Sequence, residues 1–254
     1  MSGHSKWAQI RRSKGVNDAR RGQLFTRLGR EIVVAVREGG GGDTNANFRL
    51  RMAVQRARDA NMPMDNIERT IKRALGGSDG SSLSENTYEG YGPGGTAMLV
   101  STLTENRNRT VAEVRNAFNR NGGNMGENGC VDWLFEAKGI LEVELQGHDT
   151  DELTLEAIDL GADDVDPVGA DDEVITIYTD PGDLEKIRQE LEAKKYKVLK
   201  AESSMLPKTR MEINDEKVAH QVMRLVEKLE DLDDVQNVYT NADFPEEFAA
   251  SYEG

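Results

Sequence analysis

Basic side chains surround one aromatic residue near the start of the sequence. The residues of this cluster are Lys6, Trp7, Arg11, Arg12, Lys14, Arg20 and Arg21. Positive side chains bind phosphate, and an indole ring can stack on a nucleobase. Trp7 has a second interpretation, because most large aromatic side chains are buried and this one could anchor the segment to a helical core. The cluster predicts contact with a nucleic acid, with Trp7 either stacking or packing.

The charge of the chain is unevenly divided along the sequence. The first 75 residues hold 16 of the 32 Lys and Arg residues against only seven acids, which gives them a net charge of +9. The remaining 179 residues carry a net charge of −23, and this hides the basic region within a total of −14. Such a division favours a basic head that faces nucleic acid and an acidic body that repels phosphate or meets another partner.

The head has the pattern of three helices. Leu24, Leu28, Ile32 and Val36 recur every four residues and predict a helix over 18–37, which the glycines at 39–42 end. A second helix is expected over 45–61 and a third after Pro63, so residues 1–76 form an all-α domain. Further candidate phosphate contacts on the first and third helices are Arg27, Arg69, Lys72 and Arg73.

The short turn at 61–63 raises the question of a helix-turn-helix, whose second helix would enter a major groove. No Asn or Gln stands beside the bases of the third helix in a register that would contact base edges. Contact with phosphates is therefore better supported than recognition of a base sequence.

The body changes to alternating strands and helices. The run 97–104 predicts a buried strand, Thr110 and Glu113 have the spacing of a capping box that opens a helix, and 131–135 predicts a returning strand. Residues 140–203 then follow the order β-α-β-β-α-β, typical of a ferredoxin-like unit. A strand near 210–213, a helix over 215–230 and a strand over 235–240 could complete the unit begun at 97.

The expected fold is a multidomain α+β protein. Its parts are the helical domain 1–76, a discontinuous α+β domain of 85–136 and 207–254, and a ferredoxin-like α+β domain of 137–206 inserted in it.

Two further segments carry candidate binding residues. The glycine-rich string 88–95 would let backbone N–H groups approach a ligand, but it precedes a strand and no Lys-Ser/Thr follows, so a turn with Tyr88 and Tyr91 exposed is expected. In the string 105–110, Arg107 and Arg109 alternate with asparagines. These residues either shape a turn or bind an anion or RNA. The possible second contact is therefore formed by Tyr88, Tyr91, Arg107 and Arg109.

Catalytic chemistry finds little support in the sequence. His4, His148 and His220 are scattered, and the acidic runs at 163–166, 171–173 and 231–234 have no surrounding loop of the calcium-binding type, so they are expected to be turn residues and surface charge. We therefore expect no enzyme, no metal, no cofactor and no small-molecule substrate.

A single cysteine, Cys130, excludes an internal disulfide, and no apolar stretch approaches the roughly 20 residues that span a bilayer. The expected location is the cytoplasm.

Several strings together resemble the YebC family, which includes the mitochondrial translational activator of cytochrome oxidase. They are residues 3–7, Arg21-Gly22 with Phe25, the loop 39–43, the string 88–95 and the string 106–110 with Glu113, so the resemblance covers nearly the whole chain. It implies a helical N-terminal domain and two α+β domains, the third inserted in the second. It also implies a regulator of gene expression, in the first place a DNA-binding transcriptional regulator. The alternative is a ribosome-associated translation factor that binds ribosomal RNA and activates translation or relieves stalling.

Overall fold

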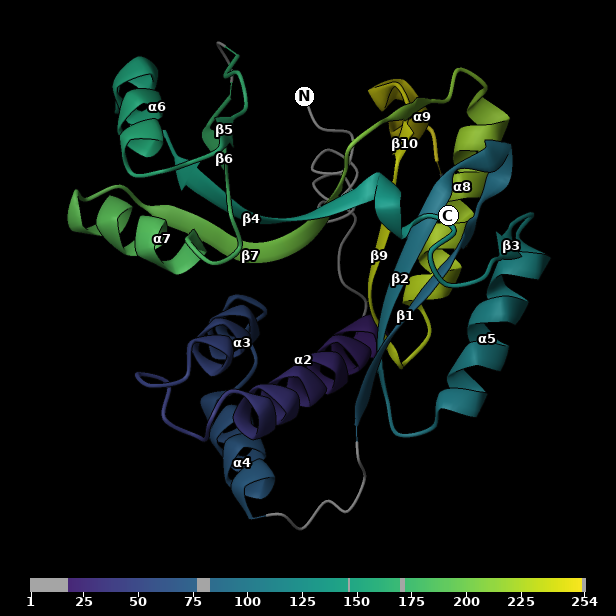
Figure 1. Ribbon diagram of the computed structural model, residues 1–254, viewed down its shortest axis with the longest axis horizontal. Helices are drawn as coiled ribbons and strands as arrows, with labels where there is room; N and C mark the ends of the chain where they lie inside the picture. Colours follow the sequence, from purple (N-terminus) through teal and green to yellow (C-terminus); the bar gives the residue numbers. More distant parts are fainter. Residues whose placement is uncertain (1–17, 77–82, 146, 170–171, 253–254) are drawn as a thin grey trace. The chain divides into compact units, whose positions relative to one another are not determined.

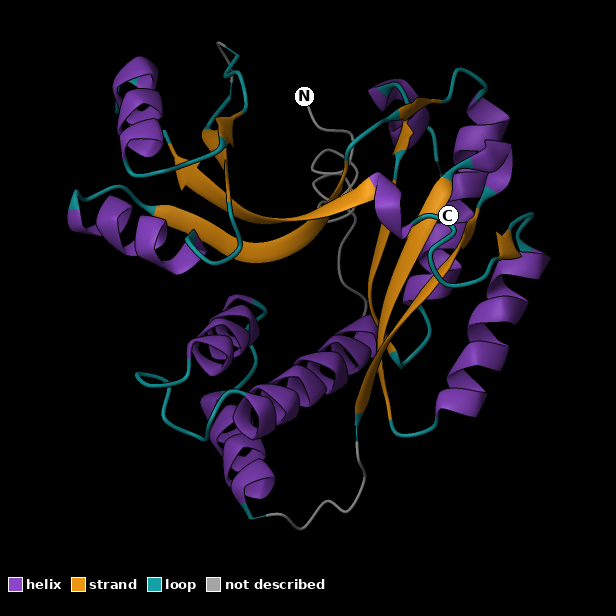
Figure 2. Cartoon of the chain, viewed as in Figure 1, coloured by secondary structure: helices purple, strands orange, loops and turns teal. Residues whose placement is uncertain are grey.

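The computed structural model describes residues 18–76, 83–145, 147–169 and 172–252 (Figure 1). The chain divides into two compact units: residues 135–208 form one, and the chain before and after them forms the other. As predicted, the fold is mixed α+β, with a helical N-terminal region followed by parts that contain sheets (Figure 2).

From residue 18 to residue 76 the N-terminal region forms the helices α2 (Asp18–Glu38), α3 (Phe48–Asp59) and α4 (Met64–Leu75). Their shared core is made of Leu28, Ile32, Val36, Leu50, Val54 and Ile67. α2 ends at the glycine run, where a Cβ on Gly39 would lie 2.6 Å from the carbonyl oxygen of Ala35. α3 begins later than the sequence predicted because Asn47 is its N-cap and accepts a hydrogen bond from the Leu50 N–H at 3.0 Å.

A four-stranded antiparallel sheet follows in the same unit, in the order β3-β1-β2-β9. Its strands are β1 (Ser84–Tyr91), β2 (Ala97–Thr104), β3 (Asn124–Met125) and β9 (Val235–Thr240). Helices α5 (Arg107–Arg120) and α8 (Glu216–Glu230) pack on one face of it, and the core between them contains Tyr88, Met98, Phe118, Leu225 and Val238. The pairing of β2 with β9 joins segments more than 130 residues apart.

Three expectations about this sheet are wrong. The predicted strand at 131–135 is instead mainly a 3-10 turn, η2 (Asp132–Leu134), because the backbone N–H groups of Val131 and Asp132 donate to the Glu89 carboxylate and not to a neighbouring strand. The expected turn at 88–95 is β1 running through Tyr91, followed by the 3-10 turn η1 (Pro93–Gly95). Helix α5 begins at Arg107 rather than at Thr110, since Asn106 accepts a hydrogen bond from the Arg109 N–H and caps it.

The unit of residues 135–208 contains a second four-stranded antiparallel sheet, in the order β5-β6-β4-β7. Its strands are β4 (Phe135–Glu144), β5 (Asp164–Val165), β6 (Val174–Thr179) and β7 (Val198–Pro207). Its helices are α6 (Thr150–Asp159) and α7 (Leu184–Ala193). Buried side chains from both helices and the sheet make its core, among them Leu141, Leu153, Ile177 and Ile187.

The chain ends with small elements against α8. A parallel pair of short strands, β8 (Met211–Glu212) and β10 (Ala242–Asp243), precedes α9 (Glu246–Ala250). Ala219 and Met223 of α8 pack with Ala249 and Tyr252 there. These contacts bury a second side of α8, beside the residues of the helix that face the sheet.

Candidate nucleic-acid interface

Helix α4 separates its apolar and basic residues onto opposite faces. Ile67 and Ala74 are buried in the helical core, whereas Arg69, Lys72 and Arg73 are exposed. Because residues three and four apart share a helix face, these bases form one patch next to the end of the helix. Exposed cations in such a patch can bind phosphate oxygens without any requirement for base sequence.

The N-terminal cluster lies mostly outside the described residues. This applies to Lys6, Trp7, Arg11, Arg12 and Lys14. Arg20 and Arg21 belong to the first turns of α2, but their side chains are outside the described part of the chain. Their role in binding stays a prediction.

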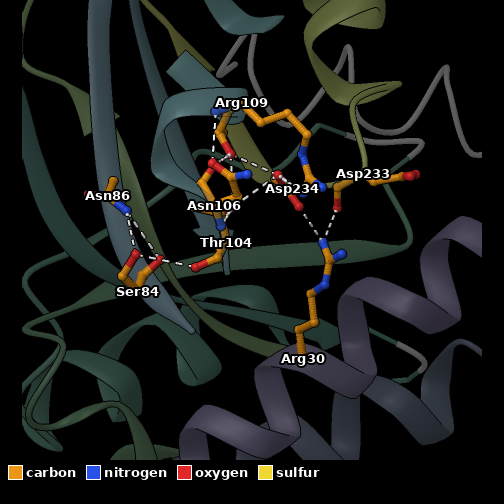
Figure 3. Close-up of polar contacts among 9 residues, drawn as sticks. Arg30, Ser84, Asn86, Thr104, Asn106, Arg109, Asp233 and Asp234 are labelled. Carbon is orange, nitrogen blue, oxygen red and sulfur yellow. Dashed lines mark hydrogen bonds and ion pairs between the residues drawn. The ribbon is translucent and has the colours of Figure 1, made fainter. Parts of the chain in front are cut away.

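Two arginines of α2 bind the segment that connects α8 with β9. Arg27 is half-buried and donates a hydrogen bond to the backbone oxygen of Glu230. Arg30 reaches from α2 to the backbone oxygen of Asp233 at 2.7 Å and to Oδ1 of Asp234 at 3.0 Å (Figure 3). Arg27, predicted as a phosphate contact, therefore has a partner inside the protein.

Asp234 is the centre of this polar network. Its side chain is only 1% exposed, and its Oδ2 accepts hydrogen bonds from Arg109 at 2.7 Å, Thr110 at 2.7 Å and Thr104 at 3.0 Å (Figure 3). The expectation that Asp234 is surface charge is wrong. A single carboxylate ties α2, through Arg30, to β2 and to the first turn of α5.

The electrostatics of Asp234 follow from these partners. Burial alone raises the pKa of a carboxyl, but the hydrogen bonds from Arg109, Thr110 and Thr104, with the charge of Arg109, outweigh it and hold the pKa of Asp234 below its ordinary value. The same contact raises the pKa of Arg109. The carboxylate is therefore ionised, and it holds the guanidinium of Arg109 in place.

The predicted second contact is not a single exposed cluster. Tyr88 is 6% exposed and its ring is part of the core between the sheet and α5, so the expectation that both tyrosines are exposed is wrong. Burial raises the pKa of Tyr88, and the nearby charge of Arg107 opposes this rise. Tyr91 is 41% exposed, and Arg107 is exposed at the start of α5. Arg109 has about half of its side chain in solvent while it pairs with Asp234.

A buried glutamate, which sequence reasoning missed, shapes the loop before η2. Glu89 accepts hydrogen bonds from the backbone N–H groups of Gly129 at 2.6 Å, Val131 at 2.8 Å and Asp132 at 2.8 Å. Burial raises the pKa of Glu89, but these three donors outweigh it and the net shift is downward. The loop then places Trp133, 64% exposed, so that it and Tyr91 both donate to the carbonyl oxygen of Cys130.

Within residues 18–76, 83–145, 147–169 and 172–252, no group of three or more His, Cys, Asp and Glu side chains is placed to hold a metal ion. Over the same ranges, each helix is too short or too polar to cross a bilayer.

Comparison with known proteins assigns two successive stretches of the sequence to one family. Residues 5–77 match the model of the TACO1/YebC protein N-terminal domain, and residues 83–242 match the model of the TACO1/YebC second and third domain. Together these matches define a multidomain protein class with a helical first domain. The chain belongs to the TACO1/YebC family.

Relatives match over nearly the full length. A "probable transcriptional regulatory protein" of Chloroflexus aurantiacus is 55% identical over 100% of both chains, and one of Moorella thermoacetica is 53% identical over 96% of both. The crystal structure of a conserved hypothetical protein from Aquifex aeolicus is 46% identical, with a TM-score of 0.79, and the match covers 90% of this chain and 92% of that one. The names of the relatives support a regulator in general.

Proposed function

We propose that the protein is a non-enzymatic, DNA-binding regulator of transcription whose helical N-terminal region contacts the nucleic acid. The observation that carries the proposal is the exposed patch of Arg69, Lys72 and Arg73 on α4, within a region of net charge +9. A basic surface of this kind binds the phosphate backbone, which supplies most of the affinity of non-specific binding. The names of the relatives from Chloroflexus and Moorella favour transcription as the process.

The acidic unit of residues 135–208 would have a complementary role. Its sequence holds 20 acids against eight bases, so it repels a phosphate backbone. Binding through the N-terminal region would then leave this unit turned toward solvent or toward a partner that is not nucleic acid.

A second contact would be at the start of α5. Arg107 is exposed there, and Arg109 presents about half of its side chain to solvent while Asp234 fixes its position. Tyr91 is exposed, but it pairs with Ala97 at the end of the β1-β2 hairpin away from Thr104 and α5, so it is not part of this contact, and Tyr88 is excluded because it is buried. In this proposal Arg107 binds a phosphate, and the half-exposed guanidinium of Arg109 adds positive charge beside that phosphate.

We further propose three domains, 1–76, 85–136 with 207–254, and a ferredoxin-like insertion of 137–206, in a cytoplasmic protein. The order β7-β4-β6-β5 supports the ferredoxin-like fold, because it puts the first strand of the unit between the fourth and the third. The pairing of β2 with β9 supports a discontinuous middle domain. The single cysteine fits a reducing compartment.

The proposal is tested by crosslinking the protein to nucleic acid in cells and sequencing what is recovered. We expect enrichment of promoter DNA, with a marked decrease in a variant that replaces Arg69, Lys72 and Arg73 with Ala. Recovery of ribosomal RNA without promoter enrichment would contradict the transcriptional role and support the translation factor. Recovery of neither would contradict both.

A further inference from the structure

A polar cavity lies between the N-terminal helices and the face of the β1-β2-β9 sheet that is turned away from α5 and α8. Its volume is about 370 Å³, within the range of about 300–1,000 Å³ common for ligand pockets. Leu24 and Leu28 of α2 and Leu103 of β2 give it apolar walls, and the remaining lining is largely amide, hydroxyl and guanidinium groups.

Strand register lines up the hydroxyl and amide groups of this cavity. Thr87 of β1 is paired with Ser101 of β2, and Ser101 is paired with Asn237 of β9, so the three side chains form a row across one face. Asn86 precedes Thr87 on β1, so its side chain alternates to the other face of the strand, where its Nδ2 donates a hydrogen bond to the backbone oxygen of Ser84 at 3.2 Å (Figure 3).

Gln236 extends this row through an irregularity of β9. The register shifts between Ser101 and Thr102, whose partners are Asn237 and Val235, so Gln236 is the extra residue of a bulge. Bulges re-aim side chains and often lie next to binding sites. Gln236 lines the cavity, yet its Nε2 is buried without a hydrogen-bond partner among the residues that the structure describes. A buried amide donor of this kind costs free energy that a ligand acceptor would recover.

The charges of the cavity argue against a phosphate as its occupant. Arg49 pairs with Glu38 and Glu85, and Arg56 pairs with Glu31 at 2.8 Å. Carboxylates in or beside the cavity neutralise these guanidinium groups. A phosphate would therefore have to displace a carboxylate before it could bind them. A neutral, flat ligand fits this lining better. The side-chain amides of the cavity can hydrogen-bond the polar edge of such a ligand, and its leucines and guanidinium planes can pack against the flat faces.

We propose that this cavity binds a single nucleobase, with Gln236 and Asn237 as the groups that hydrogen-bond its edge. The base could belong to an unpaired nucleotide of a bound strand or to a free nucleoside. Binding of an unpaired nucleotide from a nucleic-acid strand rests on the proposed function, whereas binding of a free nucleoside does not depend on it.

The test uses the full chain, four free nucleosides observed by saturation-transfer NMR, and single strands that carry one fluorescent 2-aminopurine. Gln236→Leu removes the contact with the edge of the base, and Thr87→Phe fills the cavity from β1 in case the first variant is unstable. Gln221→Leu, at an exposed position of α8, is the matched control. We expect both cavity variants to weaken nucleoside or 2-aminopurine binding by about tenfold or more, the range of one good base contact, and the control to bind as the wild type does.

The outcomes separate this inference from the proposed function. A signal from nucleosides alone identifies a free nucleoside as the ligand, and a signal from the strand alone identifies an unpaired base. No signal from either probe with folded protein, or equal signals from wild type and both folded cavity variants, would overturn the inference. Loss of the cavity signal with unchanged duplex binding would leave the proposed function intact. Absence of all nucleic-acid binding alongside nucleoside binding would contradict the proposed function alone.

Discussion

Arg30 of α2 and Asp234, just before β9, form an ion pair whose charged atoms are 3.0 Å apart and whose carboxylate is almost completely buried. Because Asp234 also binds Arg109, it links the basic N-terminal helices to the segment that holds the second candidate contact. This ion pair joins the two regions that the charge pattern separates, together with the contacts of Arg27 with Glu230 and of Arg49 with Glu85.

Replacing Asp234 with Asn should destabilise the protein. The variant leaves Arg30 and Arg109 without their counter-ion, and we expect a decrease of about 2 kcal/mol in the free energy of unfolding, less than for a fully buried pair because both arginines are partly solvated. Urea unfolding followed by circular dichroism measures the decrease. Asp233→Asn is the control, since the exposed Asp233 contributes its backbone oxygen to Arg30 and this oxygen is retained. Equal stability of the two variants would contradict the central role of Asp234.

Acid should destabilise the protein through Asp234 and Glu89. Their pKa values are lowered on folding, so the stability they contribute is complete above their unfolded-state values of about 4 and is lost as the pH falls through the folded-state values. In Asp234→Asn that share is absent, and its stability should fall less than that of the wild type between about pH 7 and 3. Unfolding midpoints measured across this range test the difference. Parallel curves for the two proteins would show that Asp234 has no lowered pKa.

Glu89→Gln should loosen the loop that carries Trp133. The amide has one acceptor oxygen where the carboxylate has two, so it cannot accept all three backbone donors, and a buried donor without a partner costs about 1–3 kcal/mol. In a Trp7→Phe background, the emission of Trp133 should shift and the unfolding midpoint should drop. Glu127→Gln, at an exposed position of the same loop, should change neither quantity. Unchanged emission in Glu89→Gln would mean that the loop does not depend on Glu89.

Two glycines of the N-terminal region should respond to alanine in opposite directions. A Cβ at Gly39 would lie 2.2 Å from Oδ1 of Asn47, the buried cap of α3, and 2.6 Å from a backbone oxygen, so Gly39→Ala should destabilise the helical region. At Gly29, inside α2, a Cβ meets no atom within 4 Å, and alanine should stabilise by about 0.5–1 kcal/mol through helix propensity. Thermal unfolding of both variants tests this, and a shift of the same sign in both would contradict it.

Elements that depend on local patterns could be predicted from the sequence. Strands β2 and β9 have the expected bounds, and α8 begins one residue after its expected start, because the apolar pattern of each lies within the element itself. Turns were less predictable: η2 has too few residues for its apolar run to distinguish strand from 3-10 turn.

The polar network could not be predicted, because its partners are far apart in the sequence. Asp234 binds Arg30 and Arg109, which lie 204 and 125 residues before it. In the sequence it looks like one acid among the neighbouring aspartates of 231–234. Glu89 binds backbone N–H groups about 40 residues later, and backbone donors have no sequence signature. The basic patch of α4 was predictable because its helix period alone puts Arg69, Lys72 and Arg73 opposite the core.

The exposed bases of α4 are central to the proposed function because they would bind the phosphates. The most direct measurement is the affinity for a DNA duplex as a function of salt concentration, for the wild type and for the variant with Arg69, Lys72 and Arg73 replaced by Ala. We expect weaker binding and a slope of log affinity against log salt that is shallower by about 0.9 for each phosphate that the variant no longer binds. A control that replaces Lys186, Lys194 and Lys197 of the acidic unit should keep the wild-type slope. Unchanged affinity and slope in the α4 variant would contradict phosphate binding by these bases.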